Sequence, residues 1–321
     1  MTWNPPGCVH GTKRLTMILI AGTGFRESRF GGDDVKIAIT GSAGLLGKGL
    51  AQVFSGRHEV RGLTRQDGDI TDVARMCAVL TDAKPDLIVH AAAMPDIDDC
   101  ERNPEQAFRV NADATKFLVE IARDLGAGFA LISTDAVFDG KSTRPCIETD
   151  PVDPPSVYGR TKAAAEESVR LYEKHWIFRV SVLFGPDKAN FVNKALCKAW
   201  GKEPYVVAND QLGSATYTLD AAETMLRVFD SGAHGTFHLC NQGACTRYDL
   251  AKRGVELAGL DSSIVVGKKM AEMKREGPRL KYAVMEMHAL KAAGIPIPRR
   301  WEAAVEEYVR SLQTSPHTGA K

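Results

Sequence analysis

From residue 35 to residue 184, short apolar runs alternate with longer segments in which apolar residues recur every three or four positions. Short uninterrupted apolar runs are typical of parallel strands that are buried on both faces. The longer segments have the periodicity of amphipathic helices. The alternation predicts βαβ units, and therefore an α/β fold with a doubly wound parallel sheet. Strands are expected at residues 36–40, 58–63, 86–92, 128–134 and 176–184, and helices at 44–54, 72–83, 104–126 and from 156.

After residue 185 the pattern becomes less regular, which predicts a second and smaller lobe. We interpret residues 35–185 as one domain and residues 186–315 mainly as a lobe over the carboxyl edge of its sheet. A segment near 213–240 is expected to return to the first domain, and residues 316–321 form a tail. In this lobe, helices are expected at 190–201, 218–229, 246–260 and 299–312, and a strand at 204–208.

Residues 1–34 have no helical or strand-like period. Lys13 and Arg14 precede about seven apolar residues, which is the lower limit for the core of a signal peptide, and no Ala-x-Ala cleavage site follows. The apolar run is too short to cross a membrane. We interpret residues 1–34 as a disordered extension with Met17 as a second candidate start, and a secretory role is the alternative.

Composition and charge describe an ordinary globular protein. The chain has 321 residues, a formal net charge of +1 and 44% hydrophobic residues, which predicts no nucleic-acid partner. Its seven cysteines form no Cys-x-x-Cys pair, so neither a zinc site nor a disulfide framework is predicted, and a reducing cytoplasm fits best. His234 and His238 are interpreted as a turn histidine and a strand histidine, not as a metal pair.

A glycine-rich turn, GSAGLLG, joins the first predicted strand to its helix. Glycine lets backbone N–H groups approach a pyrophosphate, and a helix N-terminus contributes about half a positive charge. The spacing G-x-x-G-x-x-G differs from the commonest dinucleotide fingerprint. Within a βαβ unit it still predicts a dinucleotide site, and a purely structural turn is the alternative. The expected contacts come from Gly41, Gly44, Leu45, Leu46 and Gly47.

The end of the second strand bears on the choice of cofactor. NAD-specific sites usually place an acidic residue there, which binds the adenosine ribose. Here Thr64 and Arg65 place a hydroxyl and a cation near a 2′-phosphate, which favours NADPH, with NADH as the alternative. The other interpretation of Arg65 is a solvated loop residue. Asp69 and Ile70 are expected at the adenine edge, and Asp72 as the N-cap of the next helix.

Tyr158 and Lys162 lie four residues apart in VYGRTKAAAEE and therefore share a helix face. We expect the ammonium of Lys162 to lower the pKa of Tyr158 from about 10 towards neutral pH. A phenol tuned in this way can protonate a carbonyl oxygen while a hydride arrives at the carbon. The pair predicts a nucleotide-dependent oxidoreductase. Tyr248 and Lys252 have the same spacing but follow no glycine-rich turn, so we interpret them as a surface pair.

Longer motifs accompany these residues, among them HAAAMPDIDDCE, RVNADAT, LISTDAVFDG, FRVSVLFG, NDQLGSAT and GTFHLCN. With VYGRTK, they resemble the extended short-chain dehydrogenase/reductase superfamily and, more closely, the dTDP-4-dehydrorhamnose reductase family, from about Lys36 to Leu312. The resemblance implies a Rossmann-type domain with a substrate lobe, NADPH as cofactor and a nucleotide-sugar substrate. It implies no membrane partner, and a homodimer is possible.

The resemblance also implies roles for single residues. Thr134 would hydrogen-bond the substrate ketone, Tyr158 would donate the proton, and Lys162 would hold the nicotinamide ribose. Asn111 would tie the central strands together. The cofactor cleft would be lined by Ala91, Ala92 and Ala93, and the nucleotide-sugar cleft would include Asp135, Val182, Asn190 and Gln211, of which the last two could equally be turn residues.

This sequence departs from the family pattern at substrate positions. Val182 stands where the family usually has a tryptophan against which the sugar packs, Ala215 stands for a proline and Ala136 for a tyrosine. The expected function is NADPH-dependent reduction of the 4-keto group of a nucleotide-linked 6-deoxysugar, most simply dTDP-4-dehydrorhamnose. The alternatives are a non-catalytic regulatory protein, of which this family contains an example, and an epimerase or dehydratase that uses Asp135.

Overall fold

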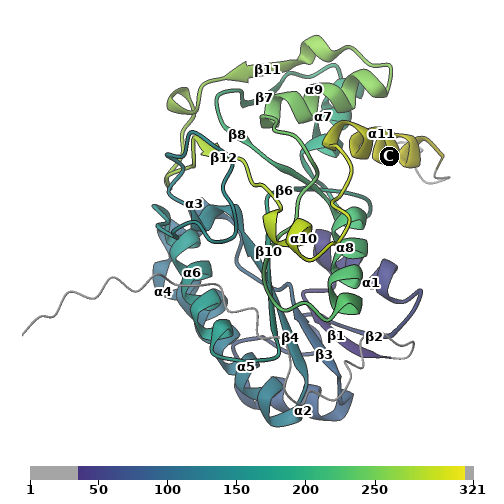
Figure 1. Cartoon of the computed structure of the whole chain (residues 1–321). Coiled ribbons are helices and arrows are strands. Elements are labelled where there is room, and N and C mark those ends of the chain that lie inside the picture. Colours follow the sequence, from purple (N-terminus) through teal and green to yellow (C-terminus); the bar gives the residue numbers. More distant parts are fainter. Residues whose placement is uncertain (1–34, 315–321) are drawn as a thin grey trace, which may run out of the picture.

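Within residues 35–314, the part of the chain that the computed structural model describes, six parallel strands form the central sheet of the larger lobe (Figure 1). Their order is β10-β5-β4-β3-β1-β2, so the winding direction reverses between β1 and β3. Ligands bind at such reversal points, beyond the carboxyl ends of the strands. The predicted doubly wound α/β fold is confirmed. The strands are β1 (Lys36–Thr40), β2 (Glu59–Leu63), β3 (Leu87–His90), β4 (Gly128–Thr134), β5 (His175–Val180) and β10 (Gly235–His238).

Helices cover both faces of the sheet. Successive side chains of a strand point to opposite faces, so Ile37 and Ile39 of β1 pack with α1 and α8, whereas Ala38 packs with α2, α5 and α6. This burial on two sides explains why the strands are apolar without a polar alternation. The helices are α1 (Leu45–Phe54), α2 (Val73–Ala83), α5 (Ala114–Leu125), α6 (Val157–Arg170) and α8 (Thr218–Ser231).

The helix expected at residues 104–126 is interrupted. It consists of α4 (Pro104–Phe108), a π-helical turn (Arg109–Asp113) and α5. Such turns often occur at functional sites. Asn111 lies in this turn and binds both backbone groups of Met94, at 2.8 and 3.1 Å, and the hydroxyl of Thr161 at 3.0 Å. Asn111 therefore joins the loop after β3 to α6, instead of joining strands. The short helix α3 (Ile97–Arg102) was not predicted.

The smaller lobe lies over the carboxyl ends of the strands of the sheet (Figure 1). Beyond the end of β4, residues of both lobes line one cavity. Its apolar core lies between α7, α9 and α11. Three two-stranded parallel pairs, β6–β9, β7–β11 and β8–β12, hold its loops. The elements are β6 (Val182–Phe184), α7 (Phe191–Trp200), β7 (Tyr205–Ala208), β8 (Leu212–Gly213), β9 (Ala215–Tyr217), α9 (Arg247–Leu257), β11 (Val265–Lys268), β12 (Tyr282–Ala283) and α11 (Trp301–Thr314).

Two later segments of the chain complete the larger lobe. β10 forms an edge of the central sheet, and α8 packs along α1. Residues 285–297, which include α10 (His288–Ala292), also enter the core that surrounds β1, and the sequence pattern did not predict this. His234 precedes β10 and His238 lies within it, as expected.

The strand expected at residues 176–184 is broken at Ser181. β5 stays in the main sheet, whereas β6 leaves it and pairs with β9. The Ser181 N–H donates to the hydroxyl of Thr216 at 3.1 Å, and the Ser181 hydroxyl donates to Asp135 at 2.5 Å. The break therefore carries Val182 out of the sheet and into the smaller lobe.

Some sequence predictions concern absent features or undescribed residues. Across residues 35–314, no helix has the length and apolar character that crossing a bilayer requires. In the same range, no group of three or more histidine, cysteine, aspartate or glutamate side chains could hold a metal ion. The predictions for residues 1–34 and 316–321 lie outside the described residues.

Candidate active site

The glycine-rich turn lies at the carboxyl end of β1, against the loop that follows β3. Gly41 has a φ of +71°, and a Cβ built on it would lie 2.6 Å from the backbone nitrogen of Ala92. A Cβ on Gly47 would lie 2.2 Å from the carbonyl oxygen of Gly41. Real Cβ atoms do not approach other atoms so closely, so both positions require glycine. Their bare backbone leaves room at the reversal point of the sheet, where a dinucleotide would bind.

The first turn of α1 fits a phosphate. Gly44 is its N-cap, and no side chain caps this end. Backbone N–H groups at such an end bind anions, with help from the helix dipole. Leu45 is half-buried, and Leu46 is buried in the core between sheet and helix. These two residues would therefore contact a cofactor through their backbone, and their side chains hold the helix in place.

The residues expected at the 2′-phosphate lie at the end of β2, close to the glycine-rich turn. The Ser42 N–H donates to the Leu63 carbonyl at 3.2 Å, which ties the two segments together. Arg65 is exposed. The hydroxyl of Thr64, by contrast, is bonded to Asp67 at 3.0 Å, so it is not an open partner for a phosphate. Asp67 also accepts the Thr64 N–H at 2.8 Å.

Asp69 and Ile70 follow at the same edge. Hydrogen bonds from the backbone and hydroxyl of Thr71 hold the pKa of Asp69 below its ordinary value, and Arg65 and Arg109 add to this effect. Ile70 is half-buried against the core below the sheet. Asp72 accepts a hydrogen bond from the Arg75 N–H at 3.0 Å and is the N-cap of α2, as predicted.

Ala91, Ala92 and Ala93, which were predicted to line the cofactor site, lie beside the glycine-rich turn. They follow β3 directly and are partly exposed. The Ala91 N–H donates to the Thr40 carbonyl at 3.2 Å, and the Ala92 N–H donates to the Thr40 hydroxyl at 3.4 Å. These bonds hold the loop against the end of β1. Their small side chains allow this loop to lie directly against Gly41.

Thr134 and Tyr158 are brought together from β4 and α6. Thr134 is the last residue of β4, and its hydroxyl accepts the Ala136 N–H at 3.1 Å. The side chain of Ser156 caps α6, so Tyr158 lies in the first turn of this helix. The Thr134 hydroxyl lies close enough to the phenol of Tyr158 to lower the pKa of this phenol. Two hydroxyls therefore converge beyond the carboxyl end of the sheet, as needed to hold a carbonyl oxygen.

The expectation that the pKa of Tyr158 is lowered is wrong, because this pKa is raised above its ordinary value. Burial raises the pKa of Tyr158, a nearby Asp135 adds to this, and only the hydrogen bond with Thr134 opposes it. The sequence showed the helical spacing but not the removal of water from the phenol, which depends on the tertiary structure. Tyr158 consequently holds its proton throughout the neutral range.

Lys162 lies one helical turn beyond Tyr158 and is only 2% exposed. Burial lowers its pKa to about 8, against the attraction of Glu166 in the following turn. His90 of β3 faces it as a neutral ring, because burial and the charge of Lys162 lower the pKa of His90 to about 3. Glu166 is held by Ser133 at 2.6 Å and by the buried Arg179 at 2.7 Å.

Asp135 binds the hydroxyls of Thr134 and Ser181 and also lines the cavity between the lobes. One carboxylate oxygen accepts from Thr134 at 3.0 Å, and the other accepts from Ser181 at 2.5 Å. Burial raises the pKa of Asp135, and these hydrogen bonds oppose the rise. Asp135, Gln211 and Arg247 line the same cavity. Gln211 therefore lines this cavity, and its role in substrate binding stays a prediction.

The cavity is narrow in this structure. It measures about 40 Å³, whereas pockets for small ligands usually measure ~300–1,000 Å³. A nucleotide-sized ligand therefore requires the two walls to separate. Arg247 and Arg279 also line this cavity, and no sequence pattern predicted either of them as a site residue. Arg247 begins α9, within the helix predicted at 246–260, and Arg279 lies in the loop before β12, but neither belongs to a recognised motif.

Two predicted substrate residues lie outside this cavity. Asn190 is buried and caps α7, and its amide also donates to the Gly185 carbonyl and to the Tyr308 hydroxyl, at 2.8 and 2.9 Å. These contacts favour the structural alternative for Asn190. Val182 is half-buried against the core of the smaller lobe and pairs with Ala215.

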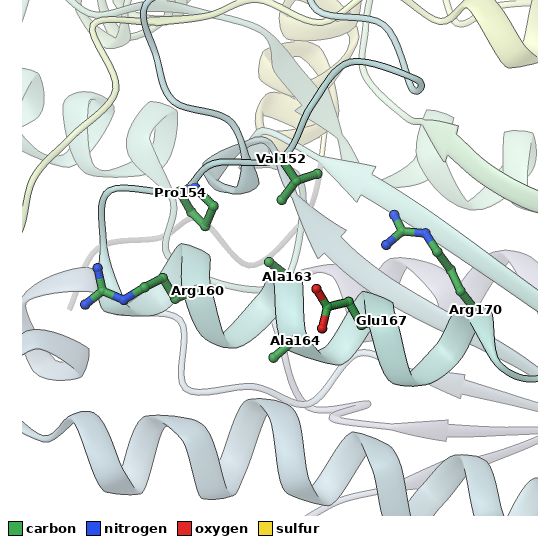
Figure 2. A pocket seen from close by; sticks show the side chains of 7 residues that line it. All are labelled: Val152, Pro154, Arg160, Ala163, Ala164, Glu167 and Arg170. Carbon is green, nitrogen blue, oxygen red and sulfur yellow. The ribbon is translucent and has the colours of Figure 1, made fainter. Parts of the chain in front are cut away.

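A larger cavity, about 270 Å³, lies on another face of α6. Val152 and Pro154 of the preceding loop form one wall, and the helix forms the other (Figure 2). None of the predicted catalytic side chains lines it, because Ala163 and Glu167 occupy a different helix face from Tyr158 and Lys162. We do not connect this cavity with catalysis. The second tyrosine–lysine pair lies on α9, where the Lys252 ammonium is 5.6 Å from the centre of the Tyr248 ring.

Comparisons with known proteins agree with this arrangement. The family model described as "RmlD substrate binding domain" matches residues 35–314. A dTDP-4-keto-6-deoxy-D-glucose reductase of Streptomyces niveus is 34% identical over 272 residues, which is 84% of this chain and 94% of that protein.

Solved structures show the same likeness. A dTDP-4-dehydrorhamnose reductase of Clostridium acetobutylicum has a TM-score of 0.83 and 35% identity, covering 87% of this chain and 100% of that one. The Bacillus anthracis enzyme of the same name, in complex with NADP, has a TM-score of 0.83 and 28% identity, covering 87% and 99%. Both superpose on the two lobes together.

Proposed function

The chain belongs to the RmlD substrate-binding-domain family, and we propose that it reduces the 4-keto group of a dTDP-linked 6-deoxysugar, with NADPH as the hydride donor. The dTDP-4-dehydrorhamnose of the named relatives is the first substrate to test. The observation that carries the proposal is the meeting of the Tyr158 and Thr134 hydroxyls beyond the carboxyl end of β4, with Lys162 buried one turn behind.

The glycine-rich turn beyond the carboxyl end of β1 supports the cofactor part of the proposal. Gly41 and Gly47 admit no Cβ, and the uncapped first turn of α1 is suited to a pyrophosphate. Arg65 is exposed at the expected position of the 2′-phosphate. When bound, NADPH supplies a hydride to the carbonyl carbon of the substrate. Lys162 would bind the ribose hydroxyls through its ammonium.

The proton comes from Tyr158. As the carbonyl carbon accepts the hydride, negative charge grows on the carbonyl oxygen, and the phenolic O–H transfers its proton there to complete the alcohol. The raised pKa of Tyr158 keeps this proton in place at neutral pH. Transfer remains favourable because an alkoxide is a much stronger base than a phenolate. Thr134 orients the carbonyl through its hydroxyl, and solvent returns a proton to Tyr158 after product release.

The test is a steady-state assay with dTDP-4-dehydrorhamnose and dTDP-4-keto-6-deoxy-D-glucose, followed through the loss of NADPH absorbance. We expect turnover with at least one of these, and dTDP-rhamnose as product from the first. Tight NADPH binding without turnover of either sugar would contradict the proposal and favour a regulatory protein. The cytoplasm as location and a homodimer as assembly stay predictions, which cell fractionation and light scattering would test.

A further inference from the structure

Arg247 is a cation in the cleft that no carboxylate balances. It is the first residue of α9, where its guanidinium donates a hydrogen bond to the side-chain oxygen of Gln211 and lies 5.2 Å from the centre of the Phe191 ring. No aspartate or glutamate among residues 35–314 lies within ion-pair distance of it. Burial holds the pKa of Arg247 below its ordinary value, and the charge of Asp135 opposes this. A partly buried cation without a partner ion is costly unless an anion binds there.

More positive charge surrounds Arg247. Arg279 lines the same cavity and Arg275 lies near it, and both lower the pKa of Arg247 further. These two arginines share a single carboxylate, Asp98, at 3.1 and 3.8 Å. Three guanidinium groups therefore face one ion-paired aspartate and the more distant Asp135. The local charge is positive although the whole chain carries only +1.

Asp135 lies between the catalytic hydroxyl of Thr134 and the arginines of the cavity. On one side its carboxylate binds the Thr134 hydroxyl, and on the other it lines the cavity with Arg247. A substrate with its carbonyl at Thr134 would thus extend past Asp135 towards Arg247. In a nucleotide sugar, the group that follows the sugar ring is a diphosphate.

We propose that Arg247, with help from Arg279, binds the diphosphate of the substrate and so places the sugar carbonyl at Tyr158. The proposal rests on the proposed function, because it assumes a nucleotide sugar in this cleft. A guanidinium can bind two phosphate oxygens at once, which a lysine cannot do. The hydrogen bond to Gln211 aims the guanidinium into the cavity before the substrate arrives.

The experiment measures binding of dTDP, of thymidine and of NADPH to the full chain by calorimetric titration. Arg247→Gln should weaken dTDP binding about 10- to 100-fold, the usual loss for hydrogen bonds to a charged group, and leave NADPH binding unchanged. Thymidine, which has no phosphate, should bind the wild type and the variant equally. Arg247→Lys should have an intermediate affinity for dTDP, because lysine keeps the positive charge but cannot bind two phosphate oxygens at once.

Arg253→Gln is the matched control, since it removes the same charge from the same helix, α9, away from the cavity residues. It should bind all three ligands like the wild type. Unchanged dTDP affinity in Arg247→Gln would overturn the inference and leave the reductase proposal standing. A wild-type protein that binds NADPH but neither dTDP nor thymidine would instead refute the proposed function. If Arg247→Gln also loses NADPH binding, the same titrations are made with Arg279→Gln. Unchanged dTDP affinity in Arg279→Gln would then overturn the inference.

Discussion

Replacing Lys162 by methionine should make the protein more stable and inactive. The ammonium of Lys162 is buried, which lowers its pKa from 10.5 to about 8. Each pKa unit corresponds to about 1.4 kcal/mol, so holding this charge near pH 7 costs about 3 kcal/mol of folding free energy. Methionine has a similar length and no charge, so the variant should recover most of that amount. Glu166 would still be bound by Arg179 and Ser133.

The gain in stability of Lys162→Met should decrease as the pH rises. In the unfolded chain Lys162 keeps its proton up to about pH 10.5, and in the folded chain only up to about pH 8. Between these values the unfolded state binds more protons, so wild-type stability from this group rises with pH. The advantage of Lys162→Met is therefore full below about pH 8 and gone near pH 10.5.

Urea unfolding of both proteins without ligand, near pH 7 and near pH 9.5, measures this difference. Lys116→Met, the same change at an exposed position of α5, is the control and should show no gain that depends on pH. A Lys162→Met protein that is no more stable than the wild type near pH 7 would refute the reasoning. So would a gain of equal size at both pH values.

Three further predictions concern the chemistry and the cofactor. Tyr158→Phe should lower kcat about 10²- to 10⁴-fold with little change in NADPH affinity, and near-normal turnover in a stopped-flow assay would exclude Tyr158 as the proton donor. Gly47→Ala places a Cβ 2.2 Å from the Gly41 carbonyl oxygen, so it should destabilise the fold by about 1 to 3 kcal/mol and weaken NADPH binding. Calorimetric unfolding and NADPH titration test these effects, and wild-type stability and affinity would contradict the close approach. Arg65→Ala should weaken NADPH binding by about 1.5 to 3 kcal/mol and leave NADH binding unchanged; an equal loss with both cofactors would show that Arg65 does not read the phosphate.

Features that depend on neighbouring residues could be predicted from the sequence. The turn at Gly41 and the cap at Asp72 are set by a few consecutive residues, and the pairing of Tyr158 with Lys162 follows from helical spacing alone. The alternation of apolar runs was enough to predict the main strands in their succession along the chain. These features are local, so no knowledge of the tertiary structure was needed.

Features that depend on the meeting of distant segments could not be predicted. The raised pKa of Tyr158 arises from burial, which spacing does not reveal. Arg247 reaches the cavity from the first turn of α9 and Arg279 from the loop before β12, and neither shares a motif with β4. The break at Ser181 is set by bonds to Asp135 and Thr216, residues dozens of positions away.

The late return of the chain to the central sheet has a consequence for biosynthesis. The core around β1 is complete only when residues up to Ile295 have joined it. A growing chain on the ribosome would carry an unfinished nucleotide domain, with the face of α1 that receives α8 uncovered, until almost all of the protein has been made. The larger lobe therefore cannot complete its folding before the smaller lobe has been synthesised. An expression fragment that ends at residue 185 should aggregate, and cofactor binding should arise only together with the substrate lobe.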